Sequence, residues 1–139
     1  MLEEYISRSV FDVFKKQFEI DIKEGADLCE KGSEFYCSSI DIIFKDGSKT
    51  ILIYTTQPML AQIAQLLLFE EDPDHQCLCD LNNEVANLVV GHAKVLASSD
   101  GYNFKIATPT FDGVTKSVDK TLCFKSAIGT LLIGLNDGR

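Results

Sequence analysis

Basic residues are scarce in this sequence. Its 139 residues contain 13 Lys and Arg against 21 Asp and Glu, which gives a formal net charge of −8 at pH 7. Arginine is represented only by Arg8 and Arg139. A nucleic-acid binder needs a basic face to displace counterions from phosphates, so the composition argues against a nucleic-acid partner. An acidic surface suits a protein partner instead.

Long apolar runs and targeting signals are also missing. The longest apolar runs, such as Leu66 to Phe69, fall far short of the roughly 20 residues that a membrane-spanning helix needs. The residues that follow Met1 contain no basic segment leading into an apolar core, so we expect no secretory signal. The sequence therefore predicts a protein without a membrane segment.

The cysteines form no recognisable disulfide framework. They are five in number: Cys29, Cys37, Cys77, Cys79 and Cys123. Because the number is odd and no pairing pattern stands out, we expect reduced thiols and a cytoplasmic protein. The run His75-x-Cys77-x-Cys79 resembles half of a zinc site, but such sites normally take four ligands in two spaced pairs. No second pair is present, so we expect no metal site.

The first half of the chain predicts a helix, a short strand and a β-hairpin. Apolar residues recur at helical spacing over residues 3–18 and alternate over residues 18–23. Residues 35–44 and 49–54 are rich in β-branched and aromatic residues, and the Asp-Gly between them is a strong turn signal. The apolar positions of the first hairpin strand change parity near Ser38, which predicts a bulge or a strong twist there.

A second helix is predicted to follow the hairpin. Thr56 is a plausible helix cap, and Pro58 suits the first turn. The expected apolar stripe consists of Leu60, Ile63, Ala64, Leu67 and Leu68. An acidic connection, residues 70–74, separates this helix from the next one, where an Asp beside the helix N-terminus is electrostatically favourable.

The end of the chain predicts more strands. Residues 102–106 alternate strictly, residues 111–117 have the composition of a loop around Asp112-Gly113, and residues 121–126 and 129–135 are two further strands. No internal repeat or linker is present. We therefore expect one α+β domain over residues 1–139, in which about three helices cover an antiparallel sheet.

A long helix over residues 75–97 has two unlike faces; Asp80 is an alternative cap, which would make the helix start later. The apolar arc is formed by Leu81, Val85, Leu88, Val89, Ala93 and Leu96. His92 lies on the apolar side, where we expect a packed core histidine rather than a catalyst. At about 100° per residue, the residues of a narrow polar stripe fall within about 40° of one line along the helix. This polar stripe consists of Asp80, Glu84, Asn87, Gly91 and Lys94.

The polar stripe has two interpretations. The simpler one is a solvated helix face. Gly91 needs a further reason, because a glycine inside a helix costs about 1 kcal/mol relative to alanine. Either a neighbouring element or a docking partner must approach the backbone at this position.

The order and spacing of these residues resemble the signature of the CheC, CheX and FliY phosphatases of bacterial chemotaxis. The matching residues are Asp80-x3-Glu84-x2-Asn87-x3-Gly91-x2-Lys94, then Asp100-Gly101-Tyr102, then Pro109. No other Glu of the chain is followed by Asn three positions later. CheC-type and FliY-type proteins usually carry two such helices and CheX-type proteins carry one, so the chain is most similar to CheX.

This resemblance implies a CheC/CheX-like fold, a homodimer and a phosphatase that acts on the aspartyl phosphate of a CheY-like response regulator. Asn87 would orient the attacking water and Glu84 would pair with the active-site lysine of the receiver. The receiver would carry the Mg²⁺, so no cofactor of the protein's own is implied. We expect Asp80, Gly91 and Lys94 to contact the receiver, because they share the helix face of this pair.

The residue types fit such a role. The chain has no P-loop, no glycine-rich phosphate cradle and no recognisable Ser, His and acid arrangement. An asparagine is no general base at neutral pH, but its amide can donate to and accept from a water and so hold it in line. The alternative is a module that docks a receiver or a flagellar-switch protein without turnover. The intact pair of Glu84 and Asn87 favours the enzyme.

Overall fold

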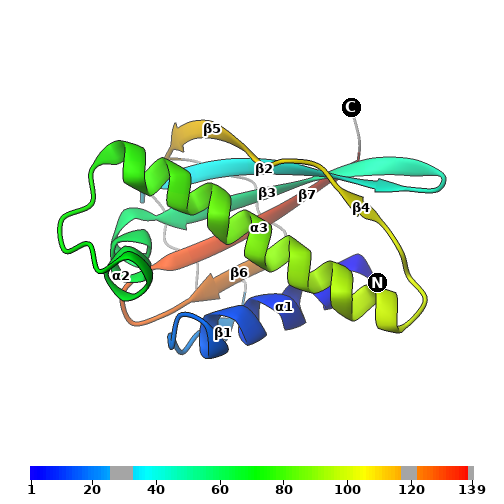
Figure 1. The fold of residues 1–139 in the computed structure, drawn as a ribbon, viewed down its shortest axis with the longest axis horizontal. Helices are drawn as coiled ribbons and strands as arrows, with labels where there is room; N and C mark the ends of the chain where they lie inside the picture. The colour runs from blue at the N-terminus through cyan, green and yellow to red at the C-terminus, as the bar shows by residue number, and fades with distance from the viewer. Residues whose placement is uncertain (26–32, 117–121, 138–139) are drawn as a thin grey trace.

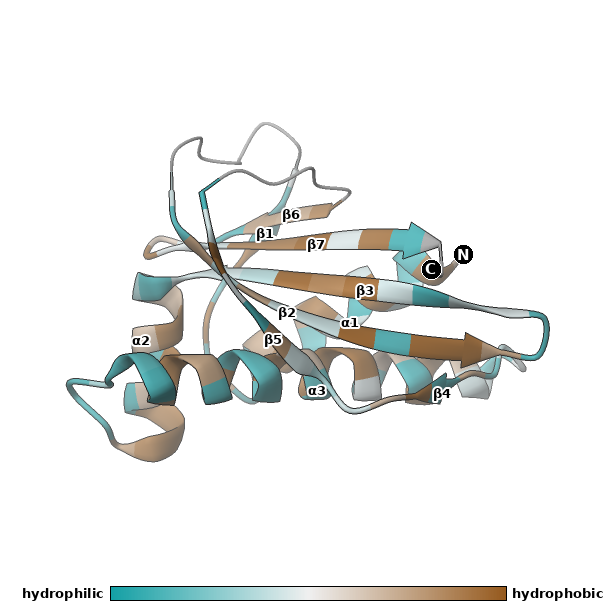
Figure 2. Ribbon diagram, turned by 90° about the horizontal axis from the view of Figure 1, so that it is seen from above, coloured by the Kyte–Doolittle hydropathy of each residue, from teal (hydrophilic) through white to brown (hydrophobic). Residues whose placement is uncertain are grey.

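The computed structural model describes residues 1–25, 33–116 and 122–137, and it places three helices on one face of an antiparallel sheet (Figures 1 and 2). The α+β architecture predicted from the sequence is therefore confirmed. None of the helices in the described ranges is both long and apolar enough to cross a membrane. The elements are α1 (Leu2–Lys16), β1 (Lys23–Glu24), β2 (Phe35–Phe44), β3 (Gly47–Thr56), α2 (Gln57–Leu68), α3 (His75–Ser99), β4 (Lys105–Ile106), β5 (Thr110–Thr115), β6 (Leu122–Lys125) and β7 (Thr130–Asp137).

The sheet is ordered β1-β6-β7-β3-β2-β4, and β5 also pairs with β2. The predicted hairpin of β2 and β3 is confirmed, and its strands pair without interruption from Phe35↔Thr56 to Phe44↔Gly47. Its turn is tighter than expected, because Gly47 already belongs to β3. The last strand, β7, lies between β3 and β6 in the interior of the sheet.

The predicted irregularity near Ser38 exists, but its extra residue lies on another strand. Cys37 pairs with Gly113 of β5, whereas Ser38 pairs with Phe111, so Asp112 is left over. The prediction of a loop over residues 111–117 is wrong, because β5 runs from Thr110 to Thr115. Asp112-Gly113 resembles a turn signal but forms a β-bulge, where Gly113 has a positive φ of 113° that suits glycine.

The parity change in the apolar positions of β2 has another cause, because β2 pairs with β3 without interruption. Tyr36 and Ile40 pack into the main core, while Phe35 packs on the opposite face in a smaller cluster with Cys123 and Leu132. The first half of β2 is therefore buried on both faces, which hides the alternation in the sequence. Ser38 is fully buried among these residues.

The main core lies between the sheet and the helices. In α1 the predicted core residues Ile6, Val10, Val13 and Phe14 are buried, but Phe11, also predicted for the apolar stripe, is 37% exposed. Leu81, Val85, Val89 and Ala93 of α3 are buried as predicted. Leu88 and Leu96 are half-buried at the borders of the α3 arc. In α2 the prediction is wrong for Leu67 and Leu68, because this helix buries residues only in its first two turns. These two side chains are 37% and 53% exposed.

Two apolar alternations do not form strands of the predicted length. Phe18 and Ile20 are buried, but strand β1 contains only Lys23 and Glu24. Strand β4 contains only Lys105 and Ile106, and the rings of Tyr102 and Phe104 pack against Phe44 with centroid separations of 5.4 and 5.6 Å. In both segments the alternation reflects packing onto the core and not sheet pairing.

The thiol groups differ from one another. The expectation that all cysteines are reduced is wrong for Cys123, which is disulfide-bonded, whereas Cys37, Cys77 and Cys79 are free. An odd number of cysteines does not prevent a single pair from forming. Cys29 lies outside the described residues. Burial raises the pKa of the Cys37 thiol to about 11.

Candidate functional site

The candidate site lies on α3, which crosses the helix-covered face of the sheet (Figure 1). Asp74 caps the helix, because its Oδ1 accepts a hydrogen bond from the Cys77 backbone N–H at 2.8 Å. The helix ends where the backbone N–H of Gly101, which has a positive φ of 83°, donates to the carbonyl of Ser98. The start of the helix agrees with the prediction. Asp80 is therefore no cap, and it accepts instead from Gln76 Nε2 at 2.9 Å.

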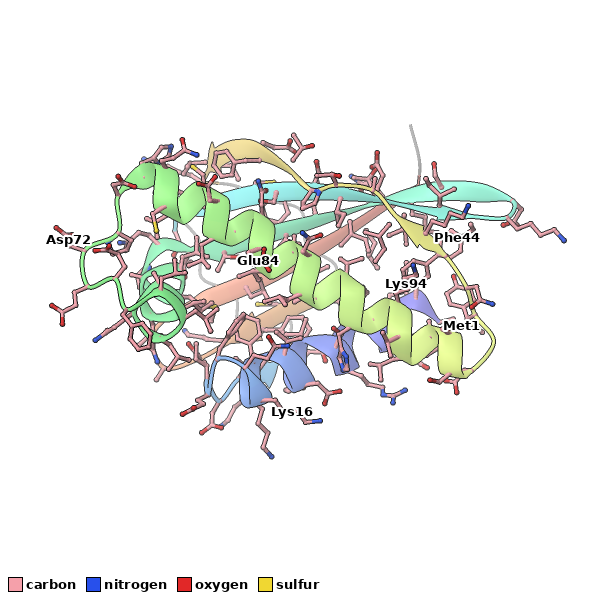
Figure 3. The ribbon with its side chains drawn as sticks, viewed as in Figure 1. Met1, Lys16, Phe44, Asp72, Glu84 and Lys94 are labelled. Atoms are coloured by element: carbon pink, nitrogen blue, oxygen red, sulfur yellow. The ribbon has the colours of Figure 1, made fainter. Side chains whose placement is uncertain are left out.

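The polar stripe lies on the outer face of α3. Asp80, Glu84, Asn87 and Lys94 are exposed and Gly91 is half-buried. Figure 3 labels Glu84 at the middle of the helix and Lys94 nearer its C-terminal end. The structure thus places all five sequence-predicted residues along one face, over a stretch of the helix that the core holds from the other side.

Within the described residues, Glu84 and Asn87 make no side-chain hydrogen bond or ion pair. The same holds for Lys94. Their backbones belong to a helix of 25 residues, so the groups are held in place at their base and free at their tips. A carboxylate, an amide and an ammonium in this state are available to a partner without first breaking an internal bond.

The environment of Gly91 excludes one of the two explanations of this glycine. A Cβ atom built on Gly91 would meet nothing within 4 Å. No element of the described chain therefore approaches the helix at this point, and the space is open to solvent. The other explanation, a docking partner that comes close to the backbone, stays a prediction.

Val95 is a site candidate that the sequence analysis missed. Its side chain is 61% exposed. It lies eleven residues after Glu84, which places it only about 20° from Glu84 around the helix. The exposed side chain of Val95 lies one helical turn after Gly91, where the space is open, and adds an apolar surface beside the polar stripe. The sequence analysis left it out because position 95 lies about 60° from the line through Asp80, outside the 40° that contain the polar stripe.

His92 is not the packed core residue that the sequence predicted. Its Nε2 lies 2.8 Å from Asp12 Oδ2 of α1, and the two side chains are 33% and 37% exposed. The hydrogen bond from His92 holds the pKa of the Asp12 carboxyl below its usual range, and Lys16 and Arg8 lower it further. Helix α1 packs along this flank of α3, so the histidine finds an acidic partner at the border of the core.

His75, in the first turn of α3, contacts both Cys79 and Tyr36. His75 Nε2 lies 3.4 Å from Cys79 Sγ, and His75 Nδ1 lies 3.2 Å from the Tyr36 hydroxyl. Over the residues that the structure describes, no group of three or more His, Cys, Asp or Glu side chains could hold a metal ion. The contact of the imidazole with Cys79 and Tyr36 ties the first turn of α3 to β2.

Solved structures with the same fold come from bacterial chemotaxis. CheX of Vibrio vulnificus matches with a TM-score of 0.79 and 20% identity over 98% of this chain and 95% of that chain. A CheC-like protein of Shewanella sp. PV-4 matches with a TM-score of 0.77 and 24% identity over 99% and 97%. The match to the CheX–CheY–BeF3–Mg²⁺ complex from Borrelia burgdorferi has a TM-score of 0.65 and 14% identity over 100% and 99%.

These matches show that the chain has the CheC-like fold. CheX proteins stand among them, so the resemblance to CheX that the motif indicated is confirmed at the level of the fold. No protein-family model and no curated protein matches the sequence. The likeness therefore depends on the fold and on the order of the motif residues.

Proposed function

We propose that the protein is a phosphatase that hydrolyses the aspartyl phosphate of a CheY-like response regulator. The observation that supports this most directly is the position of Glu84 and Asn87. Both side chains are exposed on the outer face of α3 in a CheX-like fold, and within the described residues neither makes a hydrogen bond or ion pair. The CheX structure from Borrelia burgdorferi is a complex with CheY, BeF3 and Mg²⁺. That complex supports a phosphorylated receiver as the partner of this chain.

In this reaction the receiver would supply most of the catalytic groups, and this protein would supply few. Phosphoryl transfer is accelerated mainly by positioning the nucleophile and by neutralising charge. The receiver would supply the Mg²⁺ and a lysine at its phosphoaspartate, so this chain needs no cofactor of its own. The Asn87 amide would hold the attacking water in line through one donated and one accepted hydrogen bond. The Glu84 carboxylate would pair with the receiver lysine and fix the orientation of the two proteins.

The rest of the stripe would form the contact surface. Gly91 would let the receiver approach the helix backbone, Asp80 and Lys94 would form charged contacts on either side, and Val95 would add an apolar one. A dry interface strengthens each of these electrostatic contacts. No group of this chain has to gain or lose a proton, so the rate should depend little on a titration within this protein.

Two further properties belong to the proposal. We propose that the protein is cytoplasmic and meets its receiver there. We also propose a homodimer, as the resemblance to CheX implies. In the described part of the sheet β7 is an interior strand, so an edge-to-edge dimer would have to use another strand.

The test is the decay of phosphate from a purified receiver of the same cell, with Mg²⁺ present. Wild-type protein should accelerate the decay. In Asn87→Ala this acceleration should be at least about 100-fold smaller, while the variant still binds the receiver. Asn136→Ala, at an exposed position on β7, is the matched control and should behave as wild type. Wild-type activity in Asn87→Ala would refute the catalytic role of the amide. Binding without any acceleration by the wild type would favour the docking module.

A further inference from the structure

A buried amide lies beneath the polar stripe. The side chain of Asn82 is completely buried between α3 and the sheet. Its Oδ1 accepts a hydrogen bond from Thr55 Oγ1 at 2.6 Å. Its Nδ2 donates to Ser38 Oγ at 2.9 Å and to the carbonyl oxygens of Tyr36 and Ile53 at 3.1 and 3.3 Å. One residue of α3 is thus bonded to both β2 and β3.

Stability alone does not explain an amide at this position. The surrounding residues on the same face of α3, such as Leu78, Leu81, Val85 and Ala86, are all buried and apolar. A fully paired buried polar group contributes little more than a well-packed apolar side chain of similar volume. A buried amide differs from an apolar side chain because its hydrogen bonds are directional. Apolar contacts alone allow a helix to shift on a sheet, while hydrogen bonds do not.

The geometry relates Asn82 directly to the stripe. Asn82 precedes Glu84 by two residues, so the two side chains point about 160° apart around the helix. The hydrogen bonds of Asn82 to two neighbouring strands fix both the rotation of α3 and its position along its axis. These are the two movements that would displace Glu84 and Asn87 from a docked receiver.

The other polar contacts of α3 lie elsewhere. Tyr36 reaches His75 in the first turn, and Ser9 of α1 donates to the carbonyl of Val89. Tyr5 of α1 donates to Asp100 after the helix ends. Within the described residues, Asn82 makes the only buried side-chain hydrogen bonds between α3 and the sheet, and it makes them next to Glu84.

We infer that Asn82 is a positioning residue, which holds Glu84 and Asn87 at the height and angle that hydrolysis on the bound receiver requires. This inference rests on the proposed function. A misplacement of about 1 Å in a catalytic group can reduce a rate by about 100-fold. The shift in α3 on loss of the buried amide should therefore lower kcat far more than it changes binding, since the stripe itself stays intact.

The test replaces the polar cluster by apolar residues of similar size, in the combined variant Asn82→Leu, Ser38→Ala and Thr55→Val. We expect kcat for receiver dephosphorylation to fall at least about 10-fold, with KM within about 2-fold of wild type and no fall in the melting temperature. Val89→Ala, a buried substitution on the same helix, is the control. It should lower the melting temperature and leave kcat near wild type at a temperature well below unfolding.

The outcomes separate the two proposals. A folded combined variant with wild-type kcat would overturn the positioning role, whereas a wild type without activity on a bound receiver would overturn the phosphatase. If the combined variant does not fold, the single variants Thr55→Val and Ser38→Ala test the positioning role. Each removes one hydrogen-bond partner of Asn82 and leaves Asn82 in place. A several-fold loss of kcat in these variants at constant KM would support the inference, and unchanged kcat in both would reject it.

Discussion

His92 of α3 and Asp12 of α1 lie 2.8 Å apart, at the border of the core where α1 packs against α3. The contact joins the two helices on the side of α3 that faces α1. The pair also gives the protein a local, pH-dependent contribution to stability.

The pH dependence of that contribution follows from the lowered pKa of Asp12. A carboxyl whose pKa is lower in the folded protein stabilises the fold above its ordinary pKa and loses this effect as the pH falls through the folded value. Asp12→Asn should therefore lower the free energy of unfolding by about 0.5 kcal/mol at pH 7, since partly exposed pairs contribute little. Urea unfolding of both proteins at several pH values measures the difference, which should shrink below about pH 4. A difference that is independent of pH would contradict the assignment.

Glu84 should act through its charge. Glu84→Gln keeps the size of the side chain and one acceptor oxygen but removes the charge that attracts the receiver lysine. We expect kcat/KM to fall about 10- to 100-fold and its dependence on ionic strength to become shallower. Phosphate decay at several salt concentrations measures both effects. Asp41→Asn, on the exposed part of β2, is the matched control and should change neither. An unchanged salt dependence in Glu84→Gln would speak against the ion pair.

Gly91 should show opposite effects on stability and on binding. A Cβ here meets no other group, so Gly91→Ala should raise the free energy of unfolding by up to about 1 kcal/mol. If the receiver approaches the helix backbone, the same methyl group should raise Kd several-fold, and Gly91→Leu should raise it further. Thermal unfolding and calorimetric titration with a beryllofluoride-activated receiver measure the two quantities.

The control for Gly91 is Gln62→Ala, which raises helix propensity at an exposed position of α2. It should leave Kd unchanged. Equal Kd values for wild type, Gly91→Ala and Gly91→Leu would show that no partner comes close at this position. The glycine would then have no explanation in the described structure.

Val95 should contribute to binding and little to folding. Because the side chain is 61% exposed, Val95→Asp should change the free energy of unfolding by no more than about 0.5 kcal/mol. Its carboxylate would replace an apolar contact within the docking face, so we expect Kd for the activated receiver to rise about 10-fold. Ile43→Asp, at an exposed apolar position of β2, is the matched control and should bind normally. Equal binding by both variants would exclude Val95 from the interface.

The sequence predicted the parts of the fold that depend on local pattern. The start of α3, the hairpin of β2 and β3 and the buried arc of Leu81, Val85 and Val89 follow from spacing and capping alone. The polar stripe follows from the same periodicity. These features are encoded within a few turns or strand residues, so one chain is enough to find them.

The features that escaped prediction depend on partners distant in the sequence. The β5 strand was missed because Asp112-Gly113 has the composition of a turn and becomes a bulge only when β2 lies beside it. His92 finds Asp12 eighty residues away. Asn82 gave no signal at all, because a lone amide on an apolar arc does not reveal that β2 and β3 will supply its hydrogen bonds.

The separation of the two faces of α3 has a consequence for how such a protein can change over evolution. The inner face carries the packing and the buried amide, and the outer face carries residues that no described element touches. Substitutions on the outer face are therefore nearly neutral for folding, so under the proposed function selection can adjust them for a different receiver one residue at a time. The same separation makes α3 a suitable scaffold on which to exchange receiver specificity by design, with the sheet and the other helices left untouched.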